Sequence, residues 1–185
     1  MRRVAFLVVL LAAAAGALAA VHAAMPAPYA RLWYPLRYEE IVTGHARNYE
    51  LDPALVAAVI YQESRFRPDA ESPTGALGLM QLQPDTARGI ALRTGGSRFE
   101  VADLYEPEIN VRYGCWYLRH LLQKYGDERW ALAAYNAGQA NVDRWRSEGR
   151  EIAFPETREY VARVLEAREI YRRAYPDALG GTVTS

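Results

Sequence analysis

Glu63 is the residue whose type and position most suggest catalysis. The segment YQESRF places it on the apolar face of a predicted helix, four residues after Val59 and three after Ile60. Burial disfavours the charged form of a carboxylate, so its pKa should rise toward neutrality, as a general acid requires. The alternative interpretation is a structural ion pair between Glu63 and an arginine such as Arg65 or Arg67.

The segment SPTGALGLMQLQP, residues 72–84, has the composition of a loop that could line a sugar-binding cleft. Gly75 and Gly78 would let the backbone approach a ligand closely. The side-chain amides of Gln81 and Gln83 can bond hydroxyl or acetamido groups. The alternative is an ordinary tight connection between two helices, and the glycines alone favour that alternative.

Two later segments carry polar side chains that could assist a carboxyl group. AAYNAG puts Tyr135 and Asn136 at a predicted helix end, where a tyrosine hydroxyl can orient a carboxyl group, although Asn-x-Gly is also a common stop signal. FPETREYVARV places Glu156 or Thr157 as the cap of the last helix and turns Tyr160 inward.

Other catalytic arrangements are not evident in the sequence. It contains no legible Ser/His/Asp arrangement and no phosphate-binding glycine loop, and no paired Asp/Glu motif accompanies Glu63. Standard glycosidases need a second carboxylate unless a substrate group supplies the nucleophile, and Asp69, Glu71 and Asp85 stay open as that partner. The histidines are far apart and Cys115 fits a helical apolar stripe, so we expect neither a metal site nor a cofactor.

The elements that must position these residues are predicted to be helices throughout, so the expected fold class is all-α. Apolar residues recur at helical spacing and no β-type alternation persists. An acidic or polar residue followed by proline marks several helix starts, as at Asp52-Pro53. The predicted helices span residues 37–49, 52–65, 84–92, 106–125, 127–138, a short stretch through Trp145, and 155–175.

The chain length fits one domain with different segments at its ends. Met1-Arg2-Arg3 and the uncharged run 4–21 predict that residues 1–23 are a signal peptide or a membrane anchor, and hence that the protein is exported to the cell envelope or secreted. We expect a tether over 24–34, the catalytic domain over 35–175 and a flexible tail over 176–185. Basic and acidic residues balance at 22 each, which argues against nucleic-acid binding.

Four segments taken in order resemble the soluble lytic transglycosylases, which have a lysozyme-like catalytic domain. These segments are ESRF from Glu63, GLMQ from Gly78, AYNAG from Ala134 and ETREYV from Glu156. The intervening DLYEPEINVRYGCWYL is similar to the helix that follows the GLMQ loop in that family. The resemblance runs over residues 35–175 and implies an all-α, lysozyme-like helical domain with a sugar-binding cleft.

The resemblance also implies a reaction. The enzyme would cleave the β-1,4 bond between N-acetylmuramic acid and N-acetylglucosamine without water, leaving 1,6-anhydromuramic ends, and Glu63 would act first as acid and then as base. Its partners would be peptidoglycan glycan strands, and we expect a monomer. The alternatives are a muramidase or chitinase-type hydrolase on the same fold, or a non-catalytic peptidoglycan-binding domain.

The family pattern assigns roles to the residues around Glu63. It implies that Ser64 fixes the end of the catalytic helix, and that Glu156 lies near the stem peptide of the substrate. The wall of the sugar cleft would be Gly78, Leu79, Met80 and Gln81. The residues expected near the catalytic carboxyl are Tyr135, Asn136 and Tyr160.

Overall fold

The chain folds into helices that surround one central helix. The computed structural model describes residues 26–179, and the segments 1–25 and 180–185 lie outside the described residues. The described helices are α2 (Ala27–Trp33), α3 (Glu39–Asn48), α4 (Pro53–Ser64), α5 (Pro84–Thr94), the 3-10 helix η1 (Val101–Tyr105), α6 (Pro107–Tyr125), α7 (Glu128–Ala137), α8 (Gln139–Ser147), α9 (Pro155–Ala174) and α10 (Pro176–Leu179). Over these residues the only β-type pairing is two isolated bridges, so the all-α prediction is confirmed.

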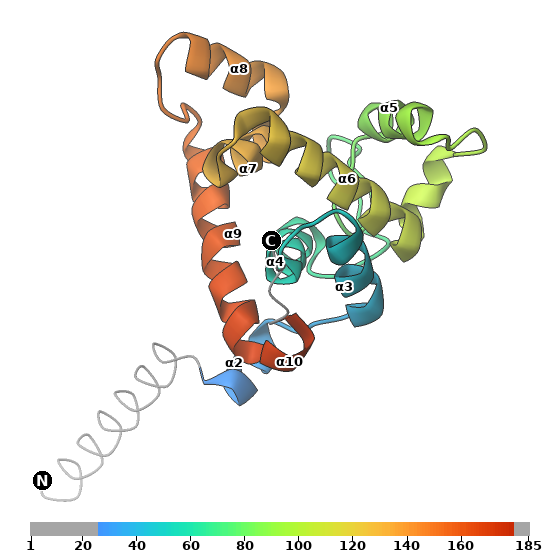
Figure 1. Cartoon of the computed structure of the whole chain (residues 1–185), viewed down its shortest axis with the longest axis vertical. Helices are drawn as coiled ribbons and strands as arrows, with labels where there is room; N and C mark the ends of the chain where they lie inside the picture. The colour runs from blue at the N-terminus through green and yellow to red at the C-terminus, as the bar shows by residue number, and fades with distance from the viewer. Residues whose placement is uncertain (1–25, 180–185) are drawn as a thin grey trace, which may run out of the picture.

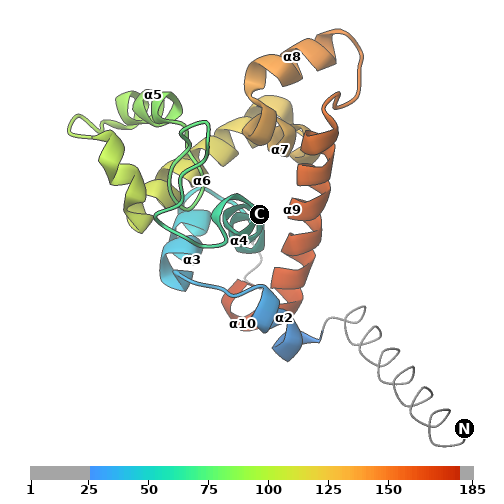
Figure 2. The same cartoon turned by 180° about the vertical axis from the view of Figure 1, so that it is seen from behind.

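The central helix is α4, which packs against α9 (Figures 1 and 2). Asp52 begins it as predicted, because its side chain accepts a hydrogen bond from the Ala54 amide and Pro53 occupies the first turn. All residues from 54 to 60 are buried. Val59 and Ile60 of the predicted apolar face are thus buried, and the residues on the other sides of these turns are buried as well.

A second, smaller apolar cluster lies away from α9. The chain leaves α4 through a long irregular loop, forms α5 and η1, and returns along α6, which links this lobe to α7 and α3 (Figures 1 and 2). The side chains of this cluster are Leu77, Leu82, Ala87, Ile90, Ala91, Leu104 and Tyr113. The 72–84 segment thus contributes apolar residues to its own lobe, and it also reaches the main core through Leu79 and Met80.

The expected tether over 24–34 differs from the structure. Residues 27–33 form α2, whose Ala30 is buried against Ile170 and Ala174 of α9. Proline fits the first turn of a helix, and Pro28 lies in the first turn of α2. At the other end, the first four residues of the expected flexible tail form α10, with Leu179 buried.

The remaining boundary differences are small. The helix expected from Arg37 begins at Glu39, after Tyr38 adopts a left-handed conformation. The α4 helix ends at Ser64, where Arg65 and Phe66 both have positive φ angles of 54° and 59°.

Cys115 is fully buried in the main core, as its apolar stripe predicted. Among the described residues, no helix is long and apolar enough to cross a membrane.

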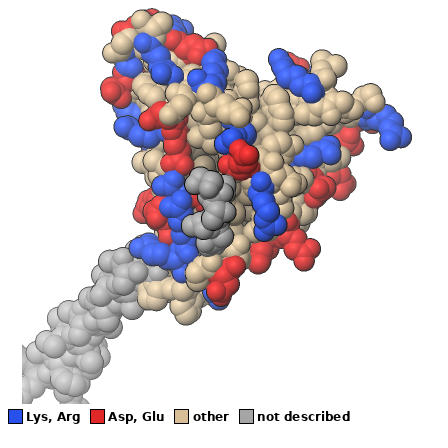
Figure 3. Space-filling view, viewed as in Figure 1, with Lys and Arg blue, Asp and Glu red and all other residues tan. Residues whose placement is uncertain are grey.

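Charges of both signs are interspersed over the surface drawn in Figure 3. The equal numbers of basic and acidic residues in the sequence are thus not separated into large single-sign regions on this face. The face drawn in Figure 3 offers no extended basic field for a nucleic-acid backbone.

Candidate active site

Glu63 meets Tyr160 at the place where α4 lies against α9. Glu63 is in the last turn of α4, and Tyr160 is in the second turn of α9, where its ring is buried. The Tyr160 hydroxyl donates a hydrogen bond of 2.6 Å to Glu63 Oε1. Two residues separated by 97 positions in the chain therefore form one acid–phenol pair.

Burial is the main cause of an altered acidity at Glu63. Part of its side chain remains accessible at the surface, but protein atoms surround most of the carboxyl group. This desolvation raises the pKa of Glu63 from 4.5 to about 7, while the hydrogen bond from Tyr160 acts in the opposite direction. A carboxyl group with such a pKa is present in both protonation states near neutral pH, so it can donate and accept a proton.

The structural ion pair considered for Glu63 is not formed. Within residues 26–179, Glu63 takes part in no salt bridge. Arg65 instead lies over the ring of Tyr61, with its Cζ 3.8 Å from the ring centroid, and Arg67 donates to the Ser64 carbonyl. Both arginines stabilise the end of α4 without neutralising the carboxylate.

Ser64 holds the end of α4 to the following loop. Its hydroxyl lies 2.7 Å from the Leu79 carbonyl oxygen and 3.2 Å from the carbonyl oxygen of Ile60, and it can donate to either. The side chain is buried, so this bond is shielded from water. Ser64 therefore fixes the end of α4, next to Glu63, relative to the backbone of Leu79.

Asn110 is a buried organising residue that the sequence reasoning missed. Its Oδ1 accepts from the Met80 amide at 2.7 Å, and its Nδ2 donates to the carbonyl oxygens of Leu77 and Leu104 at 2.9 and 2.8 Å. The side chain is completely buried in α6. The sequence did contain a signal for a buried role of Asn110. It is a polar residue immediately before Val111, where the apolar face of α6 begins.

The GLMQ segment is shaped mainly by contacts inside the protein. Gly78 has a φ of 75°, and a Cβ there would lie 2.1 Å from the Leu104 carbonyl oxygen and 2.2 Å from Asn110 Nδ2. The close backbone approach that glycine permits is thus toward the protein, and not toward a ligand as the sequence suggested. Leu79 and Met80 are completely buried, so in this structure their side chains support the loop and do not line a cleft.

Gln81 is the member of this segment that remains partly exposed. It has a left-handed φ of 48°. Its Nε2 donates to the carbonyl oxygens of Ala70 at 3.0 Å and Gly78 at 2.9 Å. Its Oε1 accepts no hydrogen bond within the described part of the chain, so the amide can both hold the loop and present an acceptor.

Tyr135 closes the site from the end of α7. Its hydroxyl donates to the Met80 carbonyl oxygen at 2.8 Å, which ties α7 to the GLMQ segment. Burial, and secondly the negative charge of Glu63, raise the pKa of Tyr135 well above its ordinary value. Tyr135 is therefore a neutral phenol, and it lies close enough to Glu63 for the carboxylate charge to affect its pKa.

Asn136 connects α7 with the start of α9. Its Oδ1 accepts a 2.8 Å hydrogen bond from the buried Thr157 hydroxyl. The prediction that Thr157 or Glu156 caps α9 was wrong, because Phe154 occupies the cap position and no side-chain cap bond is present. Thr157 instead fixes the first turn of α9 to the end of α7. This contact also helps to set the position of Tyr160, which lies in the next turn of α9.

The acidic residues left open by the sequence do not join this pair. Asp85 forms an ion pair with Arg88, and Glu71 accepts from the Tyr105 hydroxyl. No acidic side chain of the described residues contributes to the raised pKa of Glu63. Glu156 is exposed in the first turn of α9, where the structure brings it no partner within residues 26–179.

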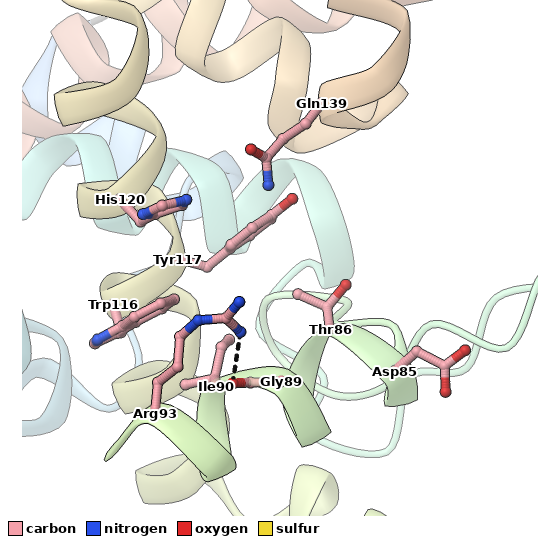
Figure 4. A pocket seen from close by; sticks show the side chains of 9 residues that line it. All are labelled: Asp85, Thr86, Gly89, Ile90, Arg93, Trp116, Tyr117, His120 and Gln139. Atoms are coloured by element: carbon pink, nitrogen blue, oxygen red, sulfur yellow. Dashed lines mark hydrogen bonds between the residues drawn. The ribbon is translucent and has the colours of Figure 1, made fainter.

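A pocket of about 180 Å³ lies between α5 and α6. The Tyr135 ring lies 5.5 Å from that of Tyr117, which lines the pocket. Figure 4 shows Trp116, Tyr117 and His120 of α6 on one side, with Thr86 and Arg93 of α5 facing them. Trp116 and His120 are stacked, with ring centroids 5.4 Å apart. Aromatic faces beside polar groups are typical of sites that bind small polar molecules such as sugars.

The described residues contain no group of three or more His, Cys, Asp or Glu side chains able to hold a metal ion. The polar groups at this site are the Glu63–Tyr160 pair and its neighbours. These are groups that transfer a proton and orient a polar substrate.

Comparison with known proteins gives a consistent set of relatives. The Transglycosylase SLT domain family matches residues 40–155. The soluble lytic murein transglycosylase of Salmonella typhimurium is 36% identical over 156 residues, which cover 75% of this chain and 23% of that protein.

Two solved structures share the fold. The 70 kDa soluble lytic transglycosylase Slt70 of Escherichia coli has a TM-score of 0.74 at 33% identity, covering 81% of this chain and 26% of that one. The lytic transglycosylase Slt of Pseudomonas aeruginosa, solved as an inactive mutant with one glutamate changed to glutamine, has a TM-score of 0.72 at 33% identity, covering 79% and 25%. The chain thus spans about a quarter of the length of these relatives.

Proposed function

The chain belongs to the Transglycosylase SLT domain family, and from that premise we propose that it is a peptidoglycan lytic transglycosylase. It cleaves the β-1,4 bond between N-acetylmuramic acid and N-acetylglucosamine and leaves a 1,6-anhydromuramic end. The observation that carries this proposal is the Glu63 carboxyl group, whose pKa burial raises to about 7. It has one tyrosine partner and no acidic neighbour that perturbs it within residues 26–179.

Glu63 performs two proton transfers in this reaction. Protonated Glu63 first donates its proton to the glycosidic oxygen as the bond from that oxygen to C1 of the muramic acid breaks. The resulting carboxylate then removes the proton of the C6 hydroxyl while the C6 oxygen forms a bond to the same C1. No water is consumed, and Glu63 ends protonated for the next cycle. The nucleophile comes from the substrate, so a second carboxylate is not required.

Tyr160 and Tyr135 serve the two states of Glu63 in different ways. Tyr160 donates to the carboxylate at 2.6 Å, which stabilises the charged form that acts as base. Tyr135 has a pKa well above its ordinary value, so it stays uncharged beside Glu63. Its hydroxyl donates to the Met80 carbonyl oxygen, which fixes the position of its ring.

Substrate contacts are proposed for the accessible residues around this pair. Gln81 offers its free amide oxygen and Asn136 its exposed side chain to the sugars, while Glu156 meets the stem peptide. Ser64, Gly78, Leu79 and Met80 act indirectly, by holding the backbone of the loop. The glycan strand continues past Tyr117 into the pocket of Figure 4.

We also propose where the enzyme works. Residues 1–23 direct export, either as a signal peptide or as an anchor through residues 4–21, and the enzyme acts as a monomer on glycan strands in the cell envelope or after secretion. An N-terminal determination on the exported protein distinguishes the two forms of residues 1–23.

Mass analysis of digested cell-wall glycan tests the reaction. The wild-type protein should release fragments lighter by one water than those that lysozyme produces, and Glu63→Gln should release none. The matched controls are Asp69→Asn, Glu71→Gln and Asp85→Asn, which should behave as the wild type. Reducing ends at the wild-type cuts would favour a hydrolase, and loss of activity in one of the controls would identify its second carboxylate. Equal activity in Glu63→Gln would refute the assignment of Glu63.

A further inference from the structure

The short helix α2 exposes two adjacent large apolar side chains. Leu32 is 78% and Trp33 is 60% exposed, and the Trp33 ring lies 6.4 Å from that of Tyr29 one turn earlier. The other large exposed apolar residues of the described chain, Leu92 and Tyr105, stand apart from each other and from α2 in the sequence. We call Leu32 and Trp33 the α2 patch.

The α2 patch is held firmly against the rest of the domain. Arg31 Nε donates to the Ala174 carbonyl oxygen at 2.8 Å, and its guanidinium lies 5.2 Å from the ring centroid of Tyr175. The Tyr61 hydroxyl of α4 donates to the Trp33 carbonyl oxygen at 2.9 Å. These bonds, with buried Ala30, hold one face of α2 to α9 and α4, so the direction of the exposed face is set by the fold.

The sequence before α2 indicates what covers this face. The run 4–21 is uncharged and apolar, and only residues 22–26 separate it from Ala27. Five residues span at most about 18 Å, less than the thickness of a bilayer's hydrocarbon core. A membrane that holds the apolar run therefore lies within reach of Leu32 and Trp33. Tryptophan favours the interface between lipid headgroups and acyl chains, where its ring is half in each environment.

We propose that the α2 patch is a membrane-contact surface, at which Leu32 and Trp33 enter the headgroup region of a lipid bilayer. The contact is apolar and not electrostatic, because the charged residues from 31 to 40 are two exposed bases, Arg31 and Arg37, and two exposed acids, Glu39 and Glu40, whose charges balance. Binding through the patch therefore depends little on salt or on anionic lipid.

The position of the patch has a consequence for the catalytic site, which rests on the proposed function. Tyr61, which binds the Trp33 carbonyl, precedes Glu63 by two residues in the same turn of α4. Two residues advance a helix by about 3 Å, so the membrane contact and the catalytic carboxyl belong to the same end of α4. The patch would thus hold the active site near the membrane surface and favour glycan strands lying there.

Tryptophan quenching in vesicles tests the membrane contact. The full chain is reconstituted into phosphatidylethanolamine and phosphatidylglycerol vesicles in which the lipids carry bromine near the headgroup end of the acyl chains. Bromine should quench part of the wild-type emission, and Trp33→Phe should lose most of that quenching, while Trp116→Phe keeps it. Equal quenching in wild type and Trp33→Phe would show that the patch stays in water or is covered by protein, and would overturn the proposal.

A spin label gives the same answer without altering Trp33. Cys115 is buried, so a nitroxide can be placed selectively at Leu32→Cys, with Leu92→Cys as the matched exposed control. Collisions with oxygen should exceed those with a water-soluble nickel complex at residue 32 only when vesicles are present, and never at residue 92. Protection at residue 32 that depends on protein concentration and not on lipid would identify a second copy as the occupant instead. Neither readout involves glycan cleavage, so these results stand apart from those on the proposed activity.

Discussion

Two of the pairs in which a tyrosine hydroxyl donates to a carboxylate join one α-helix to another, and their electrostatics are opposite. Tyr160 binds Glu63 at 2.6 Å between α9 and α4, and Tyr125 binds Asp143 at 2.9 Å between α6 and α8. Burial raises the pKa of Glu63 to about 7. The Lys124 ammonium, 2.7 Å from Asp143 Oδ2, is the main cause that lowers the pKa of Asp143.

The difference shows that the tyrosine bond does not make a carboxyl group catalytic. The surroundings decide its protonation state, because removing water destabilises the charge while a neighbouring cation stabilises it. Asp143 is an ionised surface group at pH 7, and Glu63 is divided between its two forms.

The largest expected effect is on the reaction rate. Glu63→Gln should lower glycan cleavage by about a thousandfold, because a general acid–base contributes 10²–10⁴ in rate. Asp143→Asn removes a carboxylate from the other pair and should leave the rate unchanged. Initial rates on purified glycan strands measure both variants. Comparable losses in the two would mean that the contrast in acidity has no bearing on catalysis.

The next effect is on stability as a function of pH. The pKa of Glu63 is about 7 in the folded protein and has its ordinary value of 4.5 when the chain unfolds, so the folded protein binds more protons between these values. Stability is therefore fully present below about pH 4.5 and is lost as pH rises through 7. The loss reaches about 3 kcal/mol, because each pKa unit is worth about 1.36 kcal/mol.

Glu63→Gln should remove this dependence, since an amide does not ionise. Urea unfolding of wild type and variant at pH 5 and pH 8 measures it, with the variant gaining relative stability at pH 8. A wild type whose stability relative to the variant does not fall between pH 5 and pH 8 would contradict the raised pKa.

A smaller effect on activity is expected when Tyr160, the tyrosine of the Glu63 pair, is replaced. Tyr160→Phe removes the bond that favours the carboxylate, so the pKa of Glu63 rises further and the decline of activity at alkaline pH moves to higher pH. The rate near neutral pH should fall about tenfold, the worth of one hydrogen bond to a charged group. Tyr125→Phe is the control and should leave the pH profile in place. A profile that stays fixed in Tyr160→Phe would indicate that the tyrosine only packs.

The smallest effect is expected on the acid stability contributed by the exposed Tyr125–Asp143 pair. The folded pKa of Asp143 lies below its ordinary 3.8, so its contribution to stability is present above that value and is lost as pH falls through the folded pKa. Because Asp143 is exposed, solvent screens its interactions and the contribution is small. Asp143→Asn should slightly flatten the acid side of the stability curve in thermal unfolding. A large loss at pH 7 would show that the surface pair has a structural role of its own.

The helices around these pairs could be predicted because their signals are local. Asp52 before Pro53 begins α4, Asp127 caps α7 by accepting from the Trp130 amide, and Gly95 ends α5 in a left-handed conformation. Each signal acts within one turn of chain, so neighbouring residues contain the information. The helix α2 escaped prediction because its stability comes from α9, more than 130 residues away.

Residue types and spacing alone identified Glu63 as a carboxylate in an apolar stretch, and the four ordered segments indicated the family. The tertiary structure decided the rest. It brought Tyr160 to Glu63 across 97 residues, left Arg65 and Arg67 engaged elsewhere, and made Asn110 the link that orders the GLMQ backbone. The physical reason is that a pKa depends on which atoms replace water around a group, and those atoms come from distant parts of the chain.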